Sequence, residues 1–222
     1  MDDDLRGAIR ESFLANLPAD AVAALVDGAV RVEVPAGGQI SAVEGKPSVK
    51  LVARGLLRIV RTVADGRTIT QRYMRRGDVA GIAMAFTDRK GRATGRCDAI
   101  VDSVVYQFSG EAWRLAAEHD ARIAVALLAD LGRVAEDQME HMANRALASM
   151  RQRVVGQLLD AAEGPDVIAP VTQQQLADGI GSAREVVARV LHDLREEKLV
   201  ATRVGSVVLL EPERLRLELI AS

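Results

Sequence analysis

The chain is poor in the residues that mark several common protein classes. It has one cysteine, Cys97, three histidines and only six aromatic residues among 222. A single cysteine excludes an internal disulfide and an iron–sulfur cluster held by four thiolates of one chain. The sequence also has no metal-ligand cluster, no nucleophile motif and no phosphate-binding loop motif. These absences argue against an enzyme.

Long apolar runs and a charge of one sign are also missing. The apolar runs are short, such as Ile123–Leu128, whereas a membrane span needs about 20 residues. The N-terminal Met1-Asp2-Asp3-Asp4 is acidic, unlike a signal peptide, so we expect a cytoplasmic protein with no membrane partner. Residues 148–222 hold 9 Lys and Arg against 11 Asp and Glu. Bulk charge therefore does not indicate nucleic acid, and any such site must depend on local charge placement.

What is present is typical of a folded protein with one large or two modest domains. Hydrophobic residues make up 49% and charged residues 27% of the chain. Residues 5–27 predict short helices around Pro18, because Leu5, Ile9 and Phe13 recur every four residues. The alternation in Val30–Val34 then predicts a strand with one solvent-facing side.

Turn signals dominate the next 75 residues or so and separate short β-rich segments. The turns are Pro35–Gly38, Glu44–Pro47, Arg54-Gly55, Asp65-Gly66 and Arg76–Asp78, and the segments are Lys50–Val52, Leu56–Val63, Thr68–Met74 and Ala99–Phe108. Asp-Gly between two such segments is a strong hairpin signal. The pattern predicts a small β-sandwich or barrel.

A short helix from Ser109 to about Glu118 and a long one over residues 120–148 follow. One stripe of the long helix carries Ile123, Leu127, Leu131, Val134 and Met142, with Gln138 in register. A narrow apolar stripe with charged flanks predicts a homodimer coiled coil. The alternative is packing against the chain's own β-domain. Gln138 would weaken such a coil locally, and would set its register or meet a ligand.

The region Val171–Leu210 carries the pattern of a winged helix-turn-helix. Two capping-box patterns, Thr172 with Gln175 and Ser182 with Glu185, predict two helix starts. Gly179 and Gly181 allow a tight turn between the helices. The predicted buried side chains are Leu176, Ala177 and Ile180 in the first helix and Val186 or Val187, Val190, Leu191 and Leu194 in the second. Two β-segments, Leu199–Arg203 and Val207–Leu210, form the predicted wing around Gly205-Ser206.

The outer face of the second helix predicts a DNA-reading surface. Arg184 and Arg189 are suited to guanine O6 and N7, and Glu185 is suited to the cytosine amino group. They lie near the helix N-terminus, where recognition helices contact bases. Thr172, Gln173 and Gln174 open the preceding helix, where side chains and free amides hold a phosphate. The alternative is a solvated Glu185–Arg189 ion pair with Arg184 as an ordinary surface residue.

With these features, the sequence resembles the CRP/FNR (catabolite activator) family of bacterial transcription regulators over nearly its whole length. The resemblance rests on TQQQLADGIGSAREVVARVL from Thr172, on VARGLLRIVRT from Val52, on DGRT from Asp65 and on RRGDVAG from Arg75. It implies an α+β fold with a cyclic-nucleotide-binding-like β-roll, or jelly roll, over residues 1–119, a dimerisation helix over 120–148 and a winged helix-turn-helix over 149–222. It also implies base reading by Arg184, Glu185 and Arg189, phosphate contacts by Thr172, Gln173 and Gln174, and RNA polymerase as a partner.

The effector implied by the resemblance does not fit these residues. Cyclic AMP binding in the family uses an acidic residue in a G-E-x-A/G motif and an Arg-Ser pair, but here Ile82 follows Gly81 and Ala93 follows Arg92. Gln138 and Met139 stand where the family's helix contacts the ligand. The expectation is therefore a different small effector or none, with a pocket near Gly81, Ile82, Arg92, Gln138 and Met139. Haem would need ligands from His119, His141 or Cys97, which we interpret as surface or packing residues.

The sequence thus predicts a homodimeric, sequence-specific DNA-binding transcription regulator. The resemblance implies a palindromic site with GTGA-like half-sites. The alternative hypothesis is a ligand-sensing module that signals through protein contacts, which the acidic balance of residues 148–222 favours.

Overall fold

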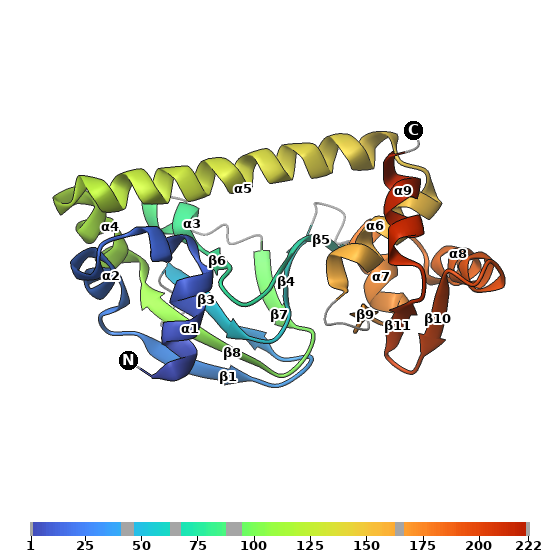
Figure 1. The fold of residues 1–222 in the computed structure, drawn as a ribbon, viewed down its shortest axis with the longest axis horizontal. Coiled ribbons are helices and arrows are strands. Elements are labelled where there is room, and N and C mark those ends of the chain that lie inside the picture. Colours follow the sequence, from blue (N-terminus) through green and yellow to red (C-terminus); the bar gives the residue numbers. More distant parts are fainter. Residues whose placement is uncertain (1, 41–46, 63–67, 88–94, 163–166, 221–222) are drawn as a thin grey trace. The chain divides into compact units, whose positions relative to one another are not determined.

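A computed structural model describes residues 2–40, 47–62, 68–87, 95–162 and 167–220. The fold is mixed α and β, as the sequence predicts: short helices lead into β-sheets, a long helix follows, and then come helices with a small three-stranded sheet (Figure 1). The chain divides into two compact units, one made of residues 1–57 and 74–139 and the other of residues 58–73 and 140–222.

The first unit begins with short helices and contains most of the strands. The order along the chain is α1 (Asp3–Glu11), the 3-10 helix η1 (Phe13–Asn16), α2 (Ala19–Val26), β1 (Val30–Val34), β2 (Gln39–Ile40), β3 (Ser48–Arg54), β6 (Val79–Ala80), α3 (Ile82–Phe86), β7 (Gly95–Ala99), β8 (Ser103–Ser109), α4 (Gly110–His119) and the start of α5 (Ala121–Leu147). One four-stranded sheet has the order β1-β8-β3-β6, and another has the order β2-β7-β4-β5, with β4 at Leu57–Thr62 and β5 at Thr68–Met74. The predicted hairpin turn at Asp65-Gly66 lies outside the described residues.

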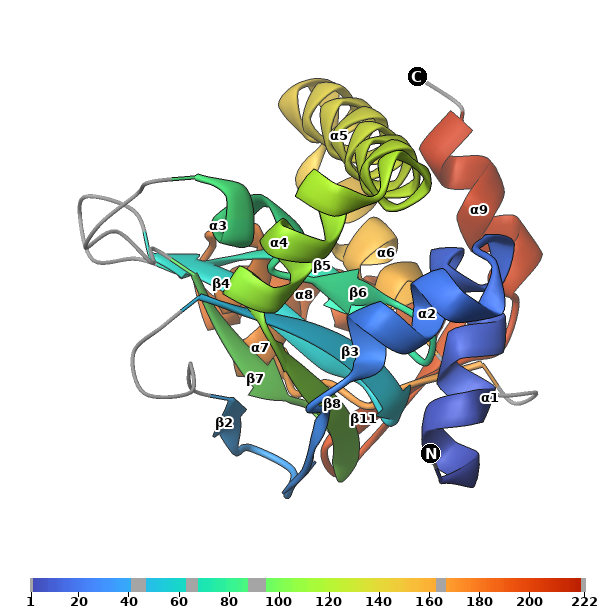
Figure 2. The ribbon, with the colours of Figure 1, turned by 90° about the vertical axis from the view of Figure 1, so that its left-hand side faces the viewer.

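Helices cover one face of the β1-β8-β3-β6 sheet and form the core with it (Figure 2). Side chains alternate between the faces of a strand, so Val49 and Leu51 of β3 point to the helices together with their antiparallel partners Phe108 and Tyr106. Trp113 of α4 is fully buried there, and its indole N–H donates a 2.8 Å hydrogen bond to the Leu25 carbonyl.

Two β-predictions need correction. The segment Ala99–Phe108 is not one strand, because β7 and β8 belong to different sheets and the chain bends between them. In that bend the Asp102 carboxylate accepts a 2.8 Å hydrogen bond from the Ala36 amide. The strand Val30–Val34 exists, but only Val34 is buried and Val30 is 51% exposed, because β1 is an edge strand.

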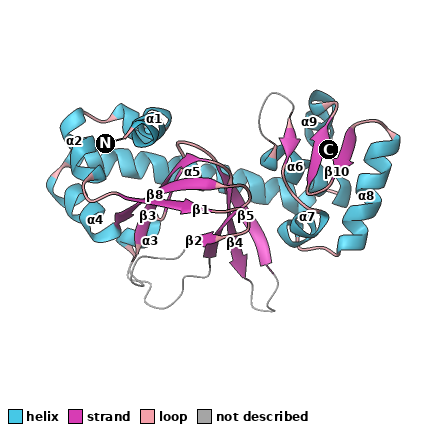
Figure 3. Ribbon diagram, turned by 90° about the horizontal axis from the view of Figure 1, so that it is seen from below, coloured by secondary structure: helices cyan, strands magenta, loops and turns pink. Residues whose placement is uncertain are grey.

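The second unit contains nearly all of β4 and β5, and then α6 (Met150–Ala161), β9 (Ile168–Ala169), α7 (Gln173–Ile180), α8 (Arg184–Glu196), β10 (Val200–Arg203), β11 (Ser206–Leu209) and α9 (Pro212–Ile220). Its last three strands pair in the order β10-β11-β9 and lie beside the helices (Figure 3). Arg151 of α6 links the end of α8 to α9, because its guanidinium bonds the carboxylates of Glu197 at 2.7 Å and Glu218 at 2.8 Å.

Candidate nucleic-acid interface

Helix α7 starts where the sequence predicts. The Thr172 hydroxyl accepts a 3.1 Å hydrogen bond from the Gln175 amide, and the Gln175 side chain accepts a 2.8 Å bond from the Thr172 amide. This reciprocal pair is the predicted capping box. The helix buries Leu176, Ala177 and Ile180 as expected.

The two glycines of the turn serve different purposes. Gly181 ends α7 in the left-handed conformation, with φ of 65°, which side chains rarely adopt. Gly179 lies inside the helix, where an added Cβ would come within 2.2 Å of the Gln157 Nε2 atom. Gln157 of α6 is 1% exposed, and Arg153, one turn earlier on α6, donates to the Ile180 carbonyl. Helix α6 thus fixes the end of α7.

The second predicted capping box is wrong. Helix α8 begins at Arg184, its N-cap is Ala183, and no side chain caps it. The reason is that Ser182 still belongs to the turn that ends α7, where its amide donates a 2.9 Å hydrogen bond to the Ala177 carbonyl. The uncapped first turn leaves amide groups without a side-chain acceptor at the positive end of the helix dipole.

The orientation of α8 leaves the predicted base-reading residues on its outer side. Val187, Leu191 and Leu194 are buried, whereas Val186 and Val190 are only partly buried. Arg184, Glu185 and Arg189 are all exposed. Among the described residues none of the three forms a salt bridge, so the alternative of a Glu185–Arg189 ion pair is not found.

The wing follows α8 as a tight hairpin. Strands β10 and β11 pair from Val200 with Leu209 to Arg203 with Ser206, and Val204 and Gly205 make the turn. Strand β10 begins one residue later than the sequence predicts, and β11 begins and ends one residue earlier. The turn is therefore Val204-Gly205 and not the predicted Gly205-Ser206, because Ser206 pairs with Arg203. The Arg195 guanidinium of α8 donates a 3.1 Å hydrogen bond to the Thr202 hydroxyl, which ties the wing to the helix.

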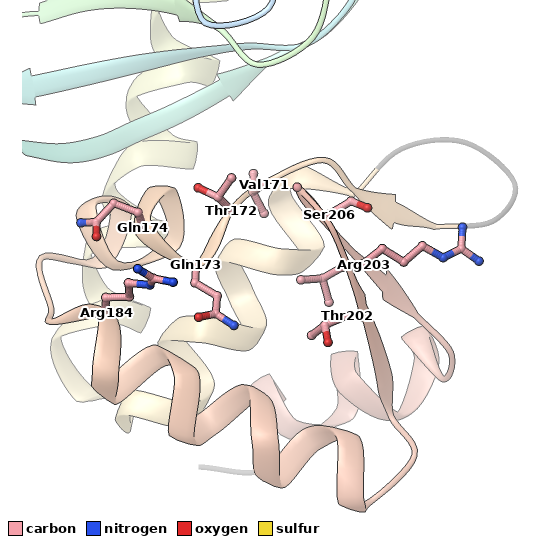
Figure 4. A pocket seen from close by; sticks show the side chains of 10 residues that line it. Val171, Thr172, Gln173, Gln174, Arg184, Thr202, Arg203 and Ser206 are labelled. Carbon is pink, nitrogen blue, oxygen red and sulfur yellow. The ribbon is translucent and has the colours of Figure 1, made fainter.

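A groove of about 440 Å³ lies between the N-termini of the two helices and the wing (Figure 4). Arg184 and Gln173 face one another on the helical side, and Thr202 and Ser206 lie on the wing. The full lining is Val171, Thr172, Gln173, Gln174, Arg184, Thr202, Arg203, Gly205, Ser206 and Val207. It contains two arginines and no carboxylate, so this surface is locally basic although residues 148–222 are acidic overall.

All three predicted phosphate residues line this groove, but they are not equivalent. The Gln174 side chain donates a 2.7 Å hydrogen bond to the Asp178 carboxylate, and Figure 4 shows it directed away from the wing. The Gln173 side chain points into the groove. The N-terminus of α7, with its positive dipole end, opens there as well. Gln174 is thus placed to contribute its backbone amide rather than its side chain.

Comparison with known proteins agrees with this geometry. The sequence profile of the Crp-like helix-turn-helix domain matches residues 152–218. The transcriptional regulator LdrP of Thermus thermophilus is 32% identical over 171 residues, which cover 74% of this chain and 83% of LdrP. The chain belongs to the CRP/FNR family. It is therefore a DNA-binding transcription regulator and not an enzyme.

Other members of the CRP/FNR family match over similar lengths. The global nitrogen regulator of Synechococcus elongatus is 26% identical over 178 residues, covering 75% of this chain and 79% of that protein. A solved structure from Eubacterium rectale, assigned to the CRP/FNR family, has the same fold. Its TM-score is 0.73 at 21% identity, over 95% of this chain and 98% of that one.

Four of the five predicted effector residues lie among the described residues, and their burial differs. Gly81 precedes α3 with φ of 94°, and a Cβ there would meet the Ser48 carbonyl at 2.3 Å. Ile82 is 3% exposed and belongs to the hydrophobic core. Gln138 is half-buried, Met139 is 62% exposed, and Arg92 lies outside the described residues.

His119 and Cys97 are the haem-ligand candidates whose side chains the structure describes. His119 approaches the Leu115 carbonyl at 2.8 Å through Nδ1, Cys97 is buried, and the side chain of His141 lies outside the described set. Within the described ranges no group of three or more His, Cys, Asp or Glu is arranged to hold a metal ion. No described helix is both long and apolar enough to cross a bilayer.

Three of the five residues in the predicted dimer stripe on α5 pack inside their own unit, whereas Met142 of that stripe is exposed. Ile123 is 1% and Leu127 3% exposed, because both pack in the core of their own unit, and Leu131 packs partly against that core. This is the alternative that the sequence left open. A different stripe is exposed: Val125, Leu128, Gly132, Ala135 and Met139 follow one another at spacings of three and four.

Sequence reasoning missed the wing side chains. Thr202, Arg203 and Ser206 line the groove, but the sequence predicts Thr202 and Arg203 only as part of a strand and Ser206 only as part of the wing turn. The available signal was the hairpin itself, because a wing that packs beside a recognition helix shares its outer surface.

Proposed function

We propose that this regulator binds palindromic DNA as a homodimer, each chain reading one GTGA-like half-site through Arg184, Glu185 and Arg189. The observation that carries the proposal is the basic groove of about 440 Å³ that opens between the recognition helix and the wing. Arg184 lines it, and Glu185 and Arg189 are exposed on the same helix.

The residue chemistry supports base reading. A guanidinium donates two hydrogen bonds to guanine O6 and N7, and a carboxylate accepts one from the cytosine amino group. Since the three side chains make no salt bridge among the described residues, they need not break an internal contact to reach a base. Arg189 lies about one turn and a half beyond Arg184, so the pair spans neighbouring base pairs.

The phosphate assignment also draws support from the site. Gln173 and the first-turn amides of α7 open on the groove, beside the Thr172 cap. A phosphate held there would fix the register of the recognition helix without reading sequence.

Homodimerisation is supported by the exposed stripe of α5, and we move the predicted seam to that stripe. Val125 is 67%, Leu128 70% and Met139 62% exposed, and spacings of three and four residues are those of a coiled-coil seam. Nothing lies within 4 Å of a Cβ built at Gly132. Small residues at this point would let two helices approach closely. Met142, 71% exposed, continues the same spacing.

We also propose a class of effector and a protein partner, both on the basis of membership in the CRP/FNR family. Because Ile82 replaces the family's acidic residue and lies in the core, we infer an effector other than cyclic AMP, bound in the β-roll unit. RNA polymerase is the proposed protein partner. Native mass spectrometry of the purified protein reports both stoichiometry and a retained small molecule.

Selection from random duplexes followed by sequencing tests the proposal. Wild type should enrich a palindrome whose half-sites lie about one helical turn apart. Arg184→Ala should lose roughly 1–3 kcal/mol of discrimination at one base pair of each half-site. Arg216→Ala removes the same charge from α9 and should enrich the wild-type sequence. If wild type enriches no palindrome, the alternative of signalling through protein contacts is favoured.

A further inference from the structure

The tip of the wing carries two side chains that the second unit does not use. The side chain of Val204 is fully exposed to solvent, so it contributes nothing to the core. Val204 lies in the two-residue turn between Arg203 and Ser206. Its neighbour Gly205 has φ of 73°, and a Cβ added to Gly205 would meet no other part of the protein within 4 Å. The tip of the wing is therefore apolar and open to solvent.

Arg203 stands beside that tip and is exposed. No described carboxylate lies within salt-bridge distance of its guanidinium. Figure 4 shows its side chain extending away from Arg184 and from the interior of the groove. Arg195 differs, because its guanidinium bonds the Thr202 hydroxyl.

The position of the groove indicates which part of a DNA duplex would contact the wing tip. In a duplex, one sugar–phosphate strand separates the major groove from the neighbouring minor groove. If α8 lies in the major groove, a strand of the duplex fits the basic, carboxylate-free groove that Arg184 and Gln173 line. The wing forms the opposite wall, so its tip lies on the minor-groove side of that strand.

We propose that Arg203 and Val204 read the minor groove beside each half-site, which gives the protein a preference for A·T pairs there. This inference rests on the proposed DNA-binding mode. An A·T pair presents only acceptors in the minor groove, whereas G·C adds the amino group of guanine, which opposes a guanidinium. A-tracts are also narrow, with an enhanced negative potential that attracts arginine. Val204 provides an apolar contact for the deoxyribose walls.

The test uses three duplexes with identical half-sites and with flanks of A·T, G·C or inosine·C pairs. Inosine lacks the minor-groove amino group but keeps the major-groove edge of guanine. Wild type should bind the A·T and inosine·C duplexes roughly tenfold more tightly than the G·C duplex, the equivalent of one charged hydrogen bond. Arg203→Ala should bind all three alike and keep its half-site selectivity.

Two further variants separate a minor-groove contact from a simple phosphate contact. Arg203→Lys keeps the charge but carries a more strongly hydrated ammonium, so it should retain non-specific affinity and lose most of the flank preference. Arg216→Ala on α9 should keep the full preference. The proposal is overturned if wild type shows no flank preference, or if Arg203→Ala weakens binding to all three duplexes equally. Loss of half-site selectivity in wild type would instead overturn the proposed function.

Discussion

Replacing Gly179 by alanine should destabilise the helix-turn-helix, although alanine is the better helix former. The new Cβ would lie 2.2 Å from Nε2, 2.7 Å from Cδ and 2.9 Å from Oε1 of Gln157. Gln157 is 1% exposed, and its Nε2 donates a 2.9 Å hydrogen bond to the Tyr73 hydroxyl in the same unit. The amide must therefore move away from Tyr73 inside a packed region.

Two costs and one gain determine the stability of the Gly179→Ala variant. Overpacking costs about 1–3 kcal/mol, and a buried hydrogen bond lost on moving the amide costs about 1–3 kcal/mol. Alanine regains only about 0.5–1 kcal/mol of helix propensity. We expect a net loss of about 2 kcal/mol. Hydrogen exchange of the α7 amides should accelerate roughly thirtyfold, because local opening becomes easier by that amount.

A double-mutant cycle isolates the contact. In a Gln157→Ala background the clash is gone. Gly179→Ala should then slow exchange in α7, because the free energy of local opening rises by about 0.5–1 kcal/mol. The reasoning is refuted if Gly179→Ala protects α7 in the wild-type chain, or if its effect is the same in both backgrounds.

Three other perturbations follow from the same structure. Arg151→Met should cost about 1 kcal/mol at pH 7, allowing for the half-exposed Glu197. Arg151 lowers the pKa of Glu197 below its ordinary 4.5, so this stabilisation is present above that pH and should fade as acid protonates the carboxylate, which urea unfolding at several pH values measures. Leu128→Glu should yield monomers in sedimentation, whereas Leu115→Glu, an exposed leucine on α4, should not; equal behaviour would contradict the proposed seam. Thr172→Ala should cost about 1 kcal/mol through the lost cap and speed exchange in the first turn of α7; unchanged exchange would show that the cap contributes little.

Local signals explain what the sequence could predict. The Thr172 capping box, the left-handed Gly181 and the buried face of α7 depend on residues within a few positions of one another. The same holds for the short strands between turns, such as β5, whose bounds agree with the prediction. Patterns of this kind are readable because each one satisfies its backbone groups locally.

Tertiary packing explains what the sequence could not predict. Helix α5 carries two apolar stripes, and spacing alone does not tell whether Ile123 or Val125 faces the core. The start of α8 moved because the end of α7 engages the Ser182 amide. Gly179 was predicted for a turn, but its role depends on Gln157, 22 positions earlier in the chain. Each of these outcomes is decided by a partner outside the local pattern.

Methylation interference tests the base-reading claim most directly. Methylating guanine N7 blocks the bidentate contact that a guanidinium makes in the major groove. On the selected site, wild type should lose binding when the half-site guanine opposite Arg184 is methylated, and Arg184→Ala should be indifferent to methylation at that position alone. Identical interference patterns for the two proteins would contradict the assignment of Arg184 as a base reader.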